Sequence, residues 1–285
     1  MSRRAFGALL VALLIPLAAC SSGATSSPSA PPAAPVSIAP GTAAGSAAVP
    51  ANLTIYAAAS LKGVLDNAKT AWETADPGSR LTISTDSSAT LETQIEQGAP
   101  ADVFLSADTT NPQKLIDKGL ATGAAVAFAG NRLTVIVPTA NPAGIKTPAD
   151  LAKKGIKVIA AGDAVPITKY ATQLVANLAR ESGYPSDFVA AYTANIASKE
   201  DNVKAVVAKI ELGEGDAAIV YVTDAKASTK VVTVDVPATA NAPAIYAGVV
   251  VKPSANASSA QAFLDWFAGP DGQAILAGFG FLPPP

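Results

Sequence analysis

The strongest constraint on the fold is an alternation of β-rich runs with amphipathic helical segments, which begins after Pro50. Residues 53–56 have the composition of a strand, and the next segment places apolar residues at the spacing of one helix face, at Leu61, Val64, Leu65, Ala68 and Trp72. The unit then repeats, with strands predicted at 81–84 and 102–105 and helices at 91–96 and 112–118. Such alternation predicts an α/β fold with parallel sheets.

The pattern breaks at residues 129–131 and then restarts. Further strands are predicted at 133–137, 158–160, 217–222 and 244–251, and further helices at 149–154, 168–180, from 203 onward and within 260–278. We therefore predict two α/β lobes, the first formed by residues 51–129 plus 241–285 and the second by residues 130–240. A ligand is expected in the cleft between them. Helix N-termini that face this cleft would bind an anion without any basic side chain.

The N-terminal segment predicts export. Arg3 and Arg4 precede an apolar run over residues 5–17, which is too short to span a bilayer comfortably, and small residues then lead to Cys20. This order resembles a bacterial lipobox, which predicts a signal peptide at residues 1–19, cleavage before Cys20 and lipid on its thiol. Residues 21–50 carry no charge and are rich in small residues, so residues 20–50 should form a lipidated, flexible tether.

Composition removes most enzyme classes. Cys20 is the only cysteine and there is no histidine, so a disulfide, a Ser-His-Asp triad and the commonest zinc ligands are excluded. Residues 1–19 hold two of the 20 basic residues and none of the 22 acidic ones, which leaves the rest of the chain with a net charge of −4. An acidic protein is a poor nucleic-acid binder, and any anion site in it must act through local hydrogen bonds.

Turns that contain small hydroxyl-bearing residues lie between predicted strands and the helices that follow them. Ser60 follows three alanines after the first strand, in the expected N-cap position of its helix. Ser88 follows the second strand, and the adjacent Ser87 is equally able to act in its place. Further helices open near Thr168 and at Asn202. Several such turns would lie along one edge of adjacent parallel strands, which favours a shared ligand site over isolated helix caps.

Five segments together resemble the periplasmic molybdate-binding protein family. They are residues 57–61 (Ala-Ala-Ala-Ser-Leu), 98–108 (Gly-Ala-Pro-Ala-Asp-Val-Phe-Leu-Ser-Ala-Asp), 162–166 (Gly-Asp-Ala-Val-Pro), 213–221 (Gly-Glu-Gly-Asp-Ala-Ala-Ile-Val-Tyr) and 269–281 with its Gly-Pro, Gly-Gln and Gly-Phe-Gly-Phe pairs. The resemblance extends over nearly all of residues 51–285. It implies a two-lobed, type II-like periplasmic-binding-protein fold whose lobes are joined by crossover strands.

The resemblance also implies a function and a site. The chain would be an extracytoplasmic, membrane-anchored receptor that captures molybdate or tungstate for the permease of an ABC importer, as a monomer, without a cofactor and without catalysis. Molybdenum would be bound only as its oxyanion. By motif, Ser60 and Ser88 would donate hydroxyls, Ile167 and Val203 backbone N–H groups, and Tyr221 its phenol. Ile167 departs from the small residue expected at its position, which a backbone donor tolerates.

Two alternatives remain open. The ligand could be sulfate, phosphate or another small anion. A phosphate receptor needs a carboxylate to accept the proton of its ligand, and Asp86 is the candidate; for a fully deprotonated anion, Asp86 and Asp201 should instead point away or accept bonds from backbone N–H groups. A surface hydrolase that uses carboxylates alone would need two acids facing each other across the cleft.

Overall fold

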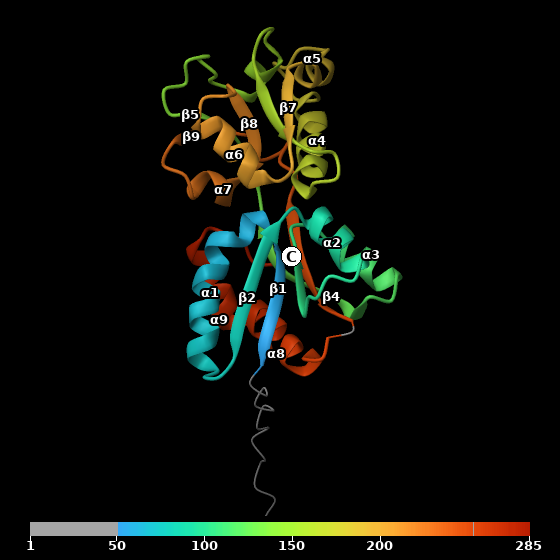
Figure 1. The fold of residues 1–285 in the computed structure, drawn as a ribbon. Coiled ribbons are helices and arrows are strands. Elements are labelled where there is room, and N and C mark those ends of the chain that lie inside the picture. Colours follow the sequence, from blue (N-terminus) through green and yellow to red (C-terminus); the bar gives the residue numbers. More distant parts are fainter. Residues whose placement is uncertain (1–50, 253) are drawn as a thin grey trace, which may run out of the picture. The chain divides into compact units, whose positions relative to one another are not determined.

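The computed structural model describes residues 51–252 and 254–285, and these contain two five-stranded sheets (Figure 1). The first sheet has the order β2-β1-β3-β10-β4. Its strands are β1 (Asn52–Ala58), β2 (Arg80–Asp86), β3 (Val103–Ser106), β4 (Ala121–Asn131) and β10 (Ala244–Val251). β1 is parallel to β2 and β3, whereas β10 is antiparallel to β3 and β4.

Helices cover both faces of the first sheet. One layer consists of α1 (Lys62–Ala75), α8 (Ala257–Ala268) and α9 (Pro270–Gly278), and the other of α2 (Ser88–Glu96) and α3 (Thr110–Asp117). Side chains of a strand alternate between faces, so Val103 and Leu105 join the core under the first layer while Phe104 joins the cluster under α2 and α3. We call this sheet with its helices the first lobe.

The second sheet has the order β7-β6-β8-β5-β9. Its strands are β5 (Leu133–Pro138), β6 (Val158–Ala161), β7 (Ile196–Glu200), β8 (Ala217–Tyr221) and β9 (Val231–Val234). β6 is parallel to β7 and β8, and β5 is antiparallel to β8 and β9. With it belong the 3-10 helix η2 (Pro148–Ala152) and the helices α4 (Pro166–Leu178), α5 (Phe188–Ala194), α6 (Val203–Glu211) and α7 (Val222–Lys226). This is the second lobe.

The predicted two-lobed α/β fold is confirmed, but the sheets are mixed rather than parallel. In each sheet four strands run in one direction, and one interior strand, β10 in the first sheet and β5 in the second, runs antiparallel to both of its neighbours. The chain passes from the first sheet to the second between Asn131 and Leu133 and returns between Val234 and Ala244. The helix expected at 149–154 is the short 3-10 helix η2, and β4, β7 and β9 were not expected.

Some predictions are not tested by this structure. The predicted lobe limits at residues 130 and 240 stay predictions, although β4 runs on to Asn131. The predicted signal peptide, Cys20 and the tether lie outside the described residues. No helix within residues 51–252 and 254–285 is long and apolar enough to cross a membrane.

Candidate functional site

All five predicted ligand residues line a small cavity between the two lobes. The first lobe contributes Ala58, Ala59, Ser60, Asp86, Ser87, Ser88 and Ala107, and the second contributes Val165, Pro166, Ile167, Asn202, Val203 and Tyr221. The empty space at this cavity is about 220 Å³.

The strand and helix ends explain why these residues meet. The carboxyl ends of the parallel strands β1 and β2 bring Ser60 and Ser88 to one edge of the first sheet. α2 begins at Ser88, α4 begins one residue before Ile167, and α6 begins at Val203. The first N–H groups of a helix have no acceptor within the helix and carry a partial positive charge. Three helix N-termini at one cavity therefore favour an anion.

Ser60 lies in the cavity wall but does not cap its helix. It belongs to a 3-10 turn, η1 (Ala59–Leu61), and the N-cap residue of α1 is Leu61, so the expected capping role is wrong. This 3-10 turn separates the end of β1 from the start of α1. The hydroxyl of Ser60 lies 3.0 Å from the phenol oxygen of Tyr246 on β10.

Of the two adjacent serines, Ser88 is the one whose side chain is held by a protein hydrogen bond. Ser88 is 1% exposed, and its Oγ accepts a bond of 3.1 Å from the backbone N–H of Ala107. That leaves its own proton available for the cavity. Ser87 occupies the N-cap position of α2 without a side-chain capping bond, and its buried Oγ has no hydrogen-bond partner among the described residues.

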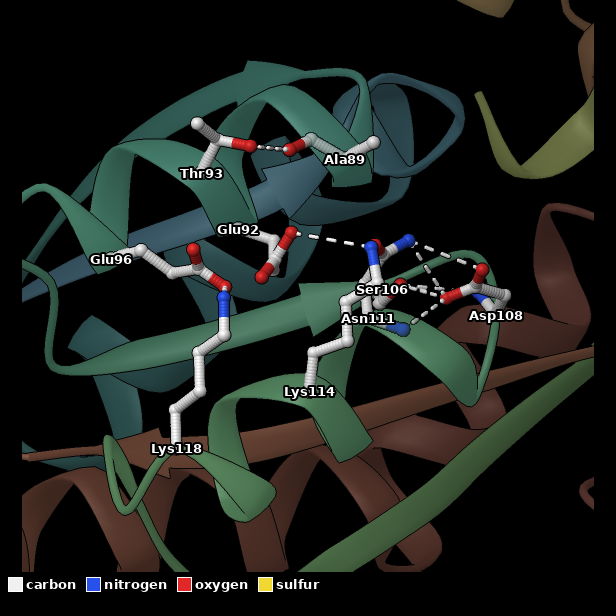
Figure 2. A network of polar contacts seen from close by, with 9 residues as sticks. All are labelled: Ala89, Glu92, Thr93, Glu96, Ser106, Asp108, Asn111, Lys114 and Lys118. Carbon is white, nitrogen blue, oxygen red and sulfur yellow. Dashed lines mark hydrogen bonds and ion pairs between the residues drawn. The ribbon is translucent and has the colours of Figure 1, made fainter. Parts of the chain in front are cut away.

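The loop that carries Ala107 is fixed by a buried carboxylate (Figure 2). Oδ1 of Asp108 accepts bonds from the hydroxyl of Ser106 at 2.9 Å and the backbone N–H of Asn111 at 3.0 Å. The amide of Asn111 donates to both carboxylate oxygens at 3.1 Å. Ser106, Asp108 and Asn111 are all buried. Hydrogen bonds within this loop therefore fix the position of the Ala107 N–H that donates to Ser88.

The same network ties α3 to α2. Lys114 donates to Oδ1 of Asn111 at 3.1 Å and lies 3.5 Å from Glu92 on α2 (Figure 2). Burial raises the pKa of Glu92, and the nearby carboxylate of Glu96 raises it further, while Lys114 opposes both. Glu96 is itself paired with Lys118. These contacts hold the helix that begins at the cavity.

Tyr221 ends β8 and lines the cavity from the second lobe. It is 1% exposed, and its hydroxyl has no hydrogen-bond partner among the described residues. Burial raises its pKa well above the ordinary value, with smaller contributions from Tyr246, Tyr170, Asp224 and Asp108. The phenol therefore keeps its proton at neutral pH. It remains a donor for which no described residue supplies an acceptor.

Asp86 is part of the cavity lining. Its Oδ1 accepts a bond of 2.7 Å from the backbone N–H of Ser87, as the alternative expectation had it. The same oxygen accepts a bond of 3.0 Å from the amide of Asn202. Asn202 caps α6 through its side-chain oxygen Oδ1, which accepts a bond of 3.1 Å from the backbone N–H of Ala205. Asp86 and Asn202 thus join the two lobes beside the cavity. Asp201 is exposed and does not line it.

A larger pocket lies within the second lobe, with about 820 Å³ of empty space beside α4 and α5. Its lining is mainly aliphatic, and its charged members Asp163 and Lys199 are paired with each other at 2.5 Å. Three helix N-termini meet at the small cavity, which makes it the better anion site. No group of three or more acidic, histidine or cysteine side chains within the described residues could hold a metal ion.

Sequence reasoning missed two contributors to the site. Ala107 supplies a backbone N–H, which no residue type signals. Tyr246 lies in an otherwise aliphatic buried strand, where a phenol must find a hydrogen-bond partner. That requirement is the one signal that could have identified it.

Comparison with known proteins agrees with the fold. A family model described as bacterial extracellular solute-binding protein matches residues 53–282. The molybdate-binding protein ModA of Mycobacterium tuberculosis (strain H37Rv) is 31% identical over 234 residues, covering 82% of this chain and 85% of that protein. A putative ABC transporter substrate-binding lipoprotein of Bacillus subtilis, YvgL, is 27% identical over 231 residues, covering 80% and 85%.

Among solved structures, the periplasmic molybdate-binding protein of Azotobacter vinelandii has a TM-score of 0.69 at 25% sequence identity. The match covers 82% of this chain and all of that one. Proteins of this family are substrate-binding components of transport. On these matches, the chain belongs to the bacterial extracellular solute-binding protein family.

Proposed function

We propose that this protein captures molybdate, and tungstate equally, and delivers the anion to the permease of an ABC importer. The observation that carries the proposal is the single small cavity lined by Ser60, Ser88, Ile167, Val203 and Tyr221. Relatives named as molybdate-binding proteins in two other bacteria support the same ligand.

The chemistry of the lining suits a fully deprotonated dianion. All four oxygens of molybdate are acceptors at neutral pH, so its site needs only donors. The hydroxyls of Ser60, Ser88 and Tyr221 and the N–H groups of Ile167 and Val203 are such donors. A hydrogen bond to a charged group contributes about 1.5–3 kcal/mol, and several together offset the loss of hydration.

The size of the cavity also favours a single inorganic ion. Its empty space of about 220 Å³ lies below the roughly 300–1,000 Å³ typical of sites for larger organic ligands. Tungstate has the same charge and nearly the same size as molybdate, so the site should not separate the two. Sulfate differs mainly by being smaller.

One observation favours a second candidate, a receptor for a protonated oxyanion such as hydrogen phosphate. Asp86 lines the cavity, and a carboxylate can accept a hydrogen bond from the hydroxyl of such an anion. Both bonds of Asp86 within the protein use Oδ1, which leaves Oδ2 for this purpose. We do not expect an enzyme, because a hydrolase based on carboxylates needs two acids and Asp86 is the only acid in the lining among the described residues.

Calorimetric titration of the purified protein with molybdate, tungstate, sulfate and phosphate tests the proposal. Tight binding of the first two without a response to the others is expected. Binding of phosphate that is lost in Asp86→Asn would favour the second candidate instead. Heat from none of the four anions would refute an oxyanion receptor.

We further propose that the receptor is a monomer held on the extracytoplasmic face of the cell membrane by lipid on Cys20. The order of residues around Cys20 supports this, and the relative in B. subtilis carries the name of a lipoprotein. Globomycin, which blocks lipoprotein signal cleavage, should leave the precursor uncleaved in an expressing bacterium. Normal processing in its presence would contradict lipid attachment.

A further inference from the structure

We propose that Tyr246 is a positioning residue that directs the Ser60 proton into the cavity. The inference rests on the proposed anion-binding function and identifies a residue behind the site that controls one of its donors. Tyr246 is fully buried on β10 and is not part of the cavity lining, so it would act on the anion only through Ser60.

The first step is the direction of the hydrogen bond between the two hydroxyls, whose oxygens are 3.0 Å apart. Asn131 indicates it, because Ser60 and Asn131 are the hydrogen-bond partners of the Tyr246 phenol among the described residues. Its side-chain oxygen accepts a bond of 2.9 Å from the N–H of Arg132, so its NH₂ group faces the other way. That NH₂ group donates to Thr223 at 2.8 Å and to the phenol oxygen of Tyr246 at 3.4 Å.

An NH₂ group cannot accept a hydrogen bond, so the phenol oxygen of Tyr246 is the acceptor in its contact with Asn131. The proton of Tyr246 is then available for the oxygen of Ser60. Tyr246 then occupies one lone pair of the Ser60 oxygen on the side away from the cavity. The hydroxyl proton of Ser60 is therefore left to point toward the cavity. Burial raises the pKa of Tyr246 well above its ordinary value, and this keeps the phenol protonated at neutral pH.

Ser88 shows the same arrangement with a different donor. Its oxygen accepts a bond from the N–H of Ala107, which cannot reverse its direction. Ser60 and Ser88 thus have their oxygens bonded from the protein side, whereas the Oγ of Ser87, the third serine in the lining, has no such bond among the described residues. A site built this way presents protons to the ligand, which suits an anion with acceptors on every oxygen.

Tyr246→Phe tests the inference cleanly, because it removes one oxygen and keeps the ring. The ring packs against Phe128, Tyr221 and Phe281, with centroid distances of 6.1, 5.6 and 5.4 Å. Asn131 keeps its shorter bond to Thr223 after the substitution. We therefore expect the variant to fold, with a melting temperature lowered by about 2–4 °C.

The experiment is a double-mutant cycle with Ser60→Ala, measured as the Kd for molybdate by calorimetry. Tyr246→Phe alone should weaken binding about 3- to 10-fold, the value of one neutral hydrogen bond. In the Ser60→Ala background the same change should alter Kd less than about 2-fold, because there is no hydroxyl left to direct. Tyr192→Phe is the matched control: Tyr192 is a buried tyrosine on α5 that does not line the cavity, and its loss should leave Kd unchanged.

Two results would overturn the inference while the proposed function stands. Equal losses from Tyr246→Phe with and without Ser60 would mean that the phenol acts by another route, for example through the ring of Tyr221. An unchanged Kd for Tyr246→Phe, with Ser60→Ala still weakening binding, would mean that Ser60 needs no direction. If the unaltered protein binds no oxyanion at all, the proposed function fails first and this inference fails with it.

Discussion

Ser88→Ala is the substitution that most directly tests the assigned site. The hydroxyl of Ser88 has two roles in the structure: it is a predicted donor to the anion, and it accepts the N–H of Ala107 at 3.1 Å in a buried position. Its removal should therefore affect both binding and stability. The two effects have separate physical causes and can be measured separately.

The expected magnitudes follow from these contacts. Loss of one hydrogen bond to a charged ligand costs about 1.5–3 kcal/mol, which weakens molybdate binding roughly 10- to 150-fold. The N–H of Ala107 would be left buried without an acceptor, which lowers the free energy of unfolding by about 1–3 kcal/mol. The loop should persist, because Asp108 and Asn111 still close it.

Calorimetry with molybdate and urea unfolding measure the two effects, and Ser87→Ala is the comparison that decides between the two adjacent serines. Ser87 is buried and also lines the cavity, but no hydrogen bond to a described residue holds its Oγ. Its loss should change the unfolding free energy by less than about 1 kcal/mol, and it should weaken binding less than Ser88→Ala does. If Ser87→Ala weakens binding more than Ser88→Ala, the donor has been assigned to the wrong serine.

Three further substitutions probe other parts of the structure. Tyr221→Phe should weaken molybdate binding about 10-fold or more and leave the melting temperature unchanged or slightly raised, because the buried hydroxyl has no described partner to lose; a clear drop in melting temperature without loss of affinity would contradict this. Gly272→Ala should destabilise the fold by about 3 kcal/mol in urea unfolding, since a Cβ there would lie 2.0 Å from the carbonyl oxygen of Phe267. Gly278→Ala, in the same helix with no atom within 4 Å, should instead stabilise by about 0.5–1 kcal/mol, and similar effects at both sites would refute the packing argument. Burial alone would raise the pKa of Asp150, but bonds from Lys153 and the N–H groups of Lys146 and Thr147 lower it to about 2. Asp150 therefore adds stability above about pH 4 that is lost as the pH falls toward 2, and the stability gap between the unaltered protein and Asp150→Asn should close over that range; a gap independent of pH would contradict the assignment.

The sequence predicted the parts of the fold that local periodicity encodes. β1, β2 and β3 and the helices that follow them lie close to their expected positions, because each has a clear strand or helix period over enough residues. The site followed from the same feature. Residues at the carboxyl ends of neighbouring parallel strands must meet at one sheet edge, so Ser60 and Ser88 could be placed together without coordinates.

The remaining features depend on long-range pairing that no local pattern reveals. β4 is rich in alanine and glycine, which gives a weak strand signal, and its strand partner β10 lies far away in the chain. The role of Tyr246 depends on the position of β10 beside β3, which brings it to Ser60 from 186 positions away in the chain. The 3-10 turn at Ser60 was missed because a serine after three alanines equally suits a helix cap.

The place of β10 in the first sheet also determines when that sheet can be completed. β10 lies between β3 and β4, although its residues follow the whole second lobe in the chain. A chain made from its N-terminus therefore has β3 with an open edge until Val251 has been synthesised. The first lobe begins first and is finished last. A chain that stops before Ala244 would lack an interior strand of the sheet, together with the tyrosine behind Ser60, and not merely a terminal extension.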